Sequence, residues 1–440
     1  MQLFNLSAGF SATYNDFHID YSNGFVMPRS SSMHQLKAFS VAVIGAGAMV
    51  VAPDVAALPG DTVQFFVAET VTNDSNVFRL SDSTNPVPLI GTSSRSDTRA
   101  STSAGVSVDA LVSRQRIQAA LTISDERYDR FSDLNFTGRD GRITWLWQAG
   151  NDFNGQVGYR DTKASSSFLN IAGTTADTLT TRRAFATGAW RLDANWELAG
   201  NLAHQEQRNG AALRQVNDVD IGTGEVGLNY VTAAQNRIGV AFRQENGDTR
   251  QLQPITVPGQ PPSVDNSYRQ RSIGVVADWN MTVKSRLNAR ADLVRRDFDQ
   301  VKQRDYSGTT LRVTYELQAS EKFAVSAVAQ RDISIGEDIQ TSFVLVKGLG
   351  IRPRWDVTEK LQLSGNVEYN VRDYLGDPLV ALGATQARSD HVRVTAGTLS
   401  YRPMTALTMG LTAQHESRSS NQARGDYTAN ILSLFGRFSF

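Results

Sequence analysis

The sequence predicts an all-β protein, a transmembrane antiparallel up-and-down β-barrel of about 18 strands of the outer-membrane type. Three observations predict this fold. Runs of about 9–14 residues alternate apolar and polar side chains, which is the strand period. Short and long links alternate between these runs, and the last run ends in phenylalanine.

The run from Ser285 to Arg296 shows the alternation clearly. Leu287 and Leu293 fall on one face, while Arg290 and Asp292 fall on the other. Strands of soluble sandwiches are usually shorter, near five or six residues. The longer runs of this chain have the length that crosses a bilayer at a tilt of about 45°.

The links between the runs supply a second signal. Links such as 318–321 and 356–360 are short, whereas 72–100 and 247–267 are long and polar, and the latter carries four prolines. Outer-membrane barrels combine short periplasmic turns with long outer loops. An even number of strands then places both termini on the periplasmic side.

Aromatic residues mark the ends of several runs. The final run, 426–440, carries Phe438 and Phe440 on one face, which matches the signal read by barrel-assembly machinery. Interface belts of aromatic residues are typical of such barrels. We expect one belt beside the short turns and one beside the outer loops, formed by Trp196, Trp279, Trp355 and Tyr401, and by Tyr128, Phe298 and Tyr374.

Composition excludes several classes of protein. The 44 basic and 44 acidic residues balance, so nucleic-acid binding is not expected. Cysteine is absent, which removes disulfides and thiolate sites. The five histidines are scattered without metal-ligand spacing, and no nucleophile motif accompanies them. We therefore expect no enzyme activity, catalytic residue, metal or cofactor.

The N-terminal region predicts export. Residues 38–52 form an apolar core of about 15 residues, too short for a membrane-spanning helix, and small residues at 55–57 offer a cleavage site. Met27 or Met33 would start a normal signal peptide. The expected organisation is therefore an upstream extension at 1–26, a signal peptide at 27–57, and one barrel domain at 58–440.

A barrel of this size encloses a space that must be lined with polar groups or plugged. Arginine dominates the basic residues, with 37 arginines against seven lysines. Charged residues on expected inward faces are braces of the wall or contacts for anionic or polyol cargo. The candidates for lumen and cargo contact are Arg243, Arg290, Arg312, Arg331, Arg354, Arg372, Arg393, Glu316 and Glu368.

The start of the predicted barrel carries a distinctive phrase, GDTVQFFVAETVTNDSNVFRLSD at 60–82. This phrase resembles the EpsL family of outer-membrane transporters of exopolysaccharide biosynthesis, which are associated with exosortase B systems. The resemblance implies a Gram-negative outer-membrane protein that exports a polysaccharide. The family-like loop positions are Asn73, Asp74, Asn76, Phe78 and Arg79, which form a structured turn with a buried phenylalanine or contact the polymer.

Three functions follow from these observations. The first is passive export of an extracellular polysaccharide through an Arg/Glu-lined lumen, with periplasmic polysaccharide-export components as partners. The second is a general or substrate-selective uptake porin. The third is a non-conducting barrel that anchors or assembles the polysaccharide machinery. Outer-membrane lipids and the barrel-assembly machinery are expected partners in all three.

Overall fold

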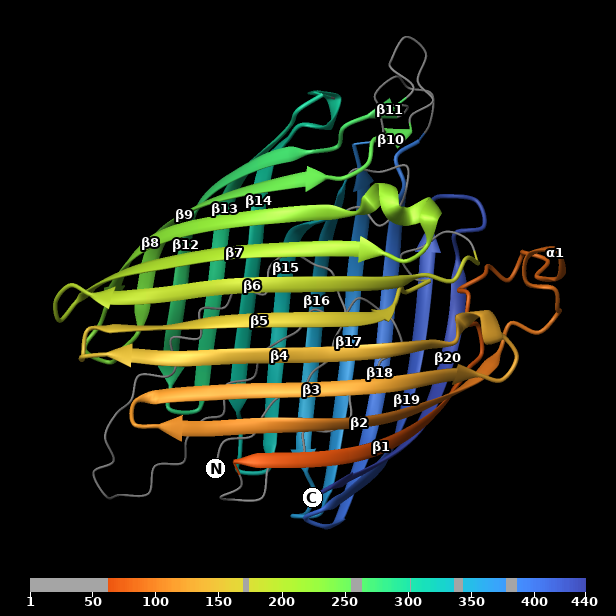
Figure 1. Cartoon of the computed structure of the whole chain (residues 1–440), viewed down its shortest axis with the longest axis horizontal. Helices are drawn as coiled ribbons and strands as arrows, with labels where there is room; N and C mark the ends of the chain where they lie inside the picture. The colour runs from red at the N-terminus through yellow and green to blue at the C-terminus, as the bar shows by residue number, and fades with distance from the viewer. Residues whose placement is uncertain (1–61, 169–173, 255–262, 301, 336–342, 377–385) are drawn as a thin grey trace.

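The computed structural model describes residues 62–168, 174–254, 263–300, 302–335, 343–376 and 386–440. Within these residues, 18 antiparallel strands form one sheet that closes into a barrel (Figure 1). This confirms the predicted fold class and strand number. The predicted extension (1–26) and signal peptide (27–57) lie outside the described residues. No helix in the described part of the chain is long and apolar enough to cross a membrane.

The strands of the barrel are mostly 12–16 residues long. They are β1 (Val63–Asp74), β2 (Asp97–Val112), β3 (Gln115–Tyr128), β4 (Phe136–Ala149), β5 (Phe153–Ser165), β6 (Thr178–Arg191), β7 (Trp196–Asn209), β8 (Val219–Val231), β9 (Arg237–Thr249), β12 (Tyr268–Thr282), β13 (Ser285–Phe298), β14 (Tyr306–Gln318), β15 (Phe323–Ile335), β16 (Phe343–Asp356), β17 (Leu361–Leu375), β18 (Ser389–Met404), β19 (Leu407–Ser420) and β20 (Tyr427–Ser439).

The links carry short additional elements. These are α1 (Val87–Ile90), η1 (Ser132–Leu134), η2 (Ala212–Asn217), η3 (Lys302–Arg304), and the two-residue strands β10 (Gln253–Pro254) and β11 (Ser263–Val264), which pair with each other. In Figure 1 the start of β1 and the end of β20 lie at the end of the barrel opposite α1, β10 and β11. The first and last strands therefore begin and end on the side of the short turns, as the even strand number predicts.

The barrel closes where its first and last strands meet. β1 pairs with β20 over Phe66–Asp74 and Ile431–Ser439. Phe65 and Phe440 extend this seam by exchanging two backbone hydrogen bonds of 2.9 Å. Closure leaves no row of unpaired amides at a sheet edge, which is the condition for a sheet to survive in hydrocarbon.

Apolar side chains alternate outward along the strands. Val240, Leu293 and Leu349 are 56, 64 and 62 % exposed although they lie mid-strand. So much apolar surface around one sheet is typical of lipid contact and not of contact with water. The outer face is therefore a lipid-facing band, and the alternate residues line the interior.

The aromatic belt beside the short turns is confirmed, because Trp196, Trp279, Trp355 and Tyr401 are all exposed on the outward face. Phe438 and Phe440 are exposed there too. Their recognition by assembly machinery stays a prediction.

The prediction of a second aromatic belt beside the outer loops was wrong. Tyr128, Phe298 and Tyr374 occupy inward positions, and Phe298 packs between Tyr268 and Phe343. The outer loops and strand ends fold inward at this end of the barrel, so these rings are buried against them instead of facing lipid.

Candidate functional site

Most of the charged residues that the alternation predicted to line the lumen lie on the inward face of the barrel. The strand registers and burial patterns place seven of the nine lumen candidates there. These seven are Arg243, Arg290, Arg312, Arg354, Arg372, Glu316 and Glu368. Their positions alternate with the exposed apolar side chains of the lipid-facing band.

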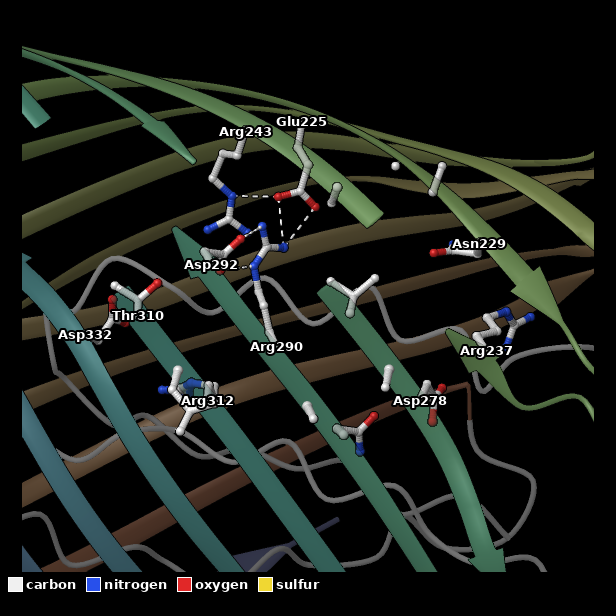
Figure 2. A pocket seen from close by; sticks show the side chains of 18 of the residues that line it. Glu225, Asn229, Arg237, Arg243, Asp278, Arg290, Asp292, Thr310, Arg312 and Asp332 are labelled. Carbon is white, nitrogen blue, oxygen red and sulfur yellow. Dashed lines mark hydrogen bonds and ion pairs between the residues drawn. The ribbon is translucent and has the colours of Figure 1, made fainter. Parts of the chain in front are cut away.

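Arg290 of β13 is the centre of a compact charged cluster, which Figure 2 shows. Its guanidinium lies 3.0 Å from Glu225 Oε2 and 2.7 Å from Asp292 Oδ2. Arg243 Nε donates to the same Glu225 oxygen at 2.6 Å. Glu225 and Arg243 are direct cross-strand partners on β8 and β9, so the cluster ties three strands of the wall together.

A glycine on the intervening strand allows this approach. Gly274 of β12 lies directly opposite Asp292, and a Cβ atom at Gly274 would come within 2.4 Å of the Asp292 carboxylate. Any larger residue would displace that carboxylate, which is the partner of Arg290. The choice of glycine therefore supports the position of the cluster.

The cluster forms one side of a cavity in the inner wall. Its other polar lining comes from Asn229, Arg237, Asp278, Thr310, Arg312 and Asp332, which Figure 2 labels, and from Asn288 and Arg331. Cationic and anionic groups lie side by side over several strands. Such a surface offers both donors and acceptors to a hydroxylated solute.

Arg312 differs from its neighbours. It lies directly opposite Arg290 in the register, and like charges in this relation repel. Its Nη2 donates to Gln330 Oε1 at 3.3 Å, and its Nε has no hydrogen-bond partner. Within the part of the chain that the structure describes, Arg312 forms no ion pair. It is the candidate best placed to bind an anionic group.

Other inward charges brace the wall. Glu368 pairs with Arg352, and Arg354 lies 3.7 Å from Asp356. The inward Arg160 pairs with Asp140 at 2.8 Å. Arg372 and Glu316 also have interaction partners. Most inward charges therefore stabilise cross-strand contacts.

The register places two lumen candidates on the outward face. Arg331 lies opposite Leu311, and its Nη1 donates to Thr309 Oγ1 at 2.6 Å, but it also borders the inner-wall cavity. Arg393 lies opposite Tyr369, and its guanidinium carbon is 5.8 Å from the centroid of that ring. Val392 and Val394, which flank Arg393, are buried on the inner face beside Tyr427, so the arginine between them faces outward.

The family-like loop after β1 forms a structured turn. The Asn76 side chain donates to the carbonyls of Leu80 and Thr428, at 2.8 and 3.0 Å. Phe78 packs edge-on against Phe131 and Phe168 from two neighbouring loops. The side chain of Asn73 donates to Thr98 Oγ1 at 3.1 Å.

Arg79 anchors this loop to the inside of the barrel. Its guanidinium lies 2.8 Å from Asp74 Oδ2 and 3.0 Å from Oε1 of the fully buried Glu416 of β19. Burial alone would lower the pKa of Arg79, but the Glu416 and Asp74 carboxylates outweigh it and raise that pKa above its ordinary value. Arg79 is therefore a fixed cation, and its contacts are structural.

The sequence did not reveal how the outer end of the lumen is filled. Tyr268 donates to Glu245 at 2.6 Å, and the buried Arg296 lies over the Tyr268 ring. Arg304 of η3 donates to Gln253 and Asn266 from two other segments. Tyr268, Glu245 and Arg296 are inward residues of the paired strands β12, β9 and β13. The contacts of Arg304 join segments between the barrel strands, and no strand period points to them.

Comparison with known proteins finds one matching family model and several solved structures with a similar fold. Residues 236–439 match a family model described as "Putative beta-barrel porin 2". No curated protein matches. The outer membrane protein OpdK from Pseudomonas aeruginosa is similar at 10 % identity, with 86 % of this chain and 99 % of that chain covered and a TM-score of 0.45.

Two further solved structures give similar values. OccAB3 from Acinetobacter baumannii is 10 % identical, with 86 % of this chain and 98 % of that chain covered and a TM-score of 0.42. A BenF-like porin from Pseudomonas fluorescens is 9 % identical, with 86 and 98 % covered and a TM-score of 0.44.

The functional conclusion rests on three findings. The sheet is closed, its outer face is a lipid-facing band, and residues 236–439 match a model described as a putative beta-barrel porin. The protein is a porin-like β-barrel channel in the outer membrane of a Gram-negative bacterium.

Proposed function

We propose that this barrel is a passive channel through which an extracellular polysaccharide leaves the cell. The observation that carries the proposal is Arg312, an inward cation without an ion-pair partner among the described residues, beside a wall of paired arginines and carboxylates. Hydroxyl groups of a sugar bind weakly to such paired charges, and a uronate or other acidic group binds Arg312.

A translocating polymer needs many weak contacts, because one tight site would stall it. The inward charges supply such contacts, since most already have partners and offer a sugar only their remaining donors and acceptors. The barrel supplies no driving force of its own. Polymer synthesis and periplasmic polysaccharide-export components below the barrel would provide it, as the resemblance of residues 60–82 to the EpsL family implies.

The runner-up is an uptake porin for small hydroxylated or acidic solutes. The match of residues 236–439 to a porin family model favours it. The same lumen allows transport in either direction. The two functions therefore differ in the size of the solute and in the machinery beside the barrel.

Deletion of the gene, with complementation by the wild type and by Arg312→Gln, tests the proposal. Export predicts loss of secreted polymer and its accumulation in the periplasm, with partial recovery by Arg312→Gln. Unchanged polymer secretion, together with slower uptake of small acids, would overturn export in favour of the porin. If deletion changes neither polymer secretion nor the uptake of small acids, and the purified barrel does not conduct, the anchor function replaces both export and uptake.

A further inference from the structure

A row of basic residues lies on the outside of the barrel, next to the lipid-facing band. We call it the outer basic row, and it consists of Arg269, Arg271, Arg295, Arg331 and Lys347 of β12, β13, β15 and β16. The strand registers put all five on the outward face. Arg331 also borders the inner-wall cavity, whereas the other four are not among the residues that line it.

The row lies at the outer end of the band. Arg271, Arg295 and Lys347 are each two residues from a strongly exposed apolar side chain of the same strand, which is a rise of about 7 Å. Those side chains are Ile273, Leu293 and Leu349. The row therefore lies at the depth where hydrocarbon gives way to lipid headgroups, on the side of the long loops.

The row contains two like-charge pairs in direct cross-strand opposition. Arg271 is opposite Arg295, and Arg331 is opposite Lys347. Like charges in this relation destabilise a sheet, and more strongly where lipid displaces water. The two pairs lie on the same wall with β14 between them, and each needs a counter-charge.

The chain supplies only part of that counter-charge. Arg295 pairs with Asp297 at 2.9 Å, and Lys347 pairs with Asp373 at 2.8 Å. Arg269 and Arg271 are exposed and form no ion pair within the described residues. On β9 the cross-strand neighbours of Arg269 and Arg271 are the neutral Asn246 and Gln244, while on β13 Arg269 is opposite Asp297, the carboxylate that pairs with Arg295.

The opposite wall of the barrel shows a contrasting pattern. There the outward arginines alternate with carboxylates across β4 to β8, from Arg139 through Asp161 to Arg182 and Glu206. Arg208 and Asp220 continue the chain of ion pairs. That wall is nearly neutralised by the protein itself, so the excess of positive charge is local to the outer basic row.

We propose that the outer basic row binds phosphate groups of the phosphorylated glycolipid of the outer leaflet. A phosphate between opposed guanidinium groups accepts bidentate hydrogen bonds from each and replaces repulsion with attraction. Apolar side chains directly below the row contact the acyl chains of the same lipid. Lipid bound in this way stabilises the β12–β16 wall from outside.

Binding is measured on the purified full-length barrel in neutral detergent, by thermal unfolding during titration with lipopolysaccharide, dephosphorylated lipopolysaccharide or inorganic phosphate. The variant is Arg271→Gln/Arg295→Gln/Arg331→Gln/Lys347→Gln. The control is Arg139→Gln/Arg182→Gln on the opposite wall. We expect wild type and control to be stabilised by the phosphorylated glycolipid, and the variant to bind it at least about ten-fold more weakly.

The detergent-only measurement separates binding from misfolding. Without anionic lipid, the variant should unfold at the same temperature as wild type or higher, because its like-charge pairs are gone. Equal binding by wild type and variant would overturn the proposal. Equal stabilisation by dephosphorylated lipopolysaccharide would also overturn it, because binding would then not require phosphate. Equal stabilisation by inorganic phosphate alone would overturn it as well, because binding would then not require a lipid. A partner protein that binds wild type through this row without glycolipid would do the same.

Discussion

Arg79 makes the sharpest prediction about stability. Replacement by methionine keeps an unbranched apolar stem but removes the cation that neutralises Asp74 and Glu416. Removal of one partner from a buried ion pair costs about 3–5 kcal/mol. Glu416 keeps the hydrogen bond from Tyr427 at 2.5 Å, so we expect a loss near the lower limit, about 3 kcal/mol.

Urea unfolding in detergent micelles, followed by tryptophan fluorescence, measures this loss as a lower midpoint. The double variant Arg79→Met/Glu416→Gln leaves no unpaired charge at Glu416 and should recover more than half of the loss. Arg127→Met is the control, because Arg127 and Asp125 form an exposed pair worth less than about 1 kcal/mol. A loss at Arg79 no larger than at Arg127, or no recovery in the double variant, would refute the reasoning.

Three further changes test other parts of the molecule. Val240→Arg places a charge in lipid and should cost about 2–4 kcal/mol in micelle or bilayer unfolding, whereas Arg at the inward position Gln118 should cost far less. Arg312→Gln should lower the anion-to-cation permeability ratio, measured as a shift in reversal potential, and an unchanged potential would exclude Arg312 from the conducting path. Phe440→Ala should reduce the amount of folded barrel in cell membranes while changing the unfolding midpoint of refolded protein little, and normal assembly would remove Phe440 from the assembly signal.

Alternation predicted the barrel because the period of two is set by the strand itself and repeats in every run. It also placed Arg243, Arg290 and Arg312 on the inner wall. It failed at Arg393, because the alternating Val392 and Val394 are buried inward beside Tyr427 and leave the arginine on the outer face, opposite Tyr369.

Contacts made by loops were beyond the sequence. Arg79 and Glu416 are 337 positions apart, and nothing local to either residue indicates the other. Phe298 looked like an interface aromatic because it ends a strand, yet the inward fold of the neighbouring strand ends buries it against Phe343. A strand period ends with its strand, so it says nothing about how long loops fill the outer end of the lumen.

The central claim is that this chain forms a conducting channel with a charged lumen. Reconstitution of the purified full-length barrel in planar lipid bilayers under a salt gradient tests it most directly. The account predicts stepwise current increments and a reversal potential that Arg312→Gln shifts toward cations. Folded, heat-modifiable protein that inserts into the bilayer and produces no current steps would contradict it.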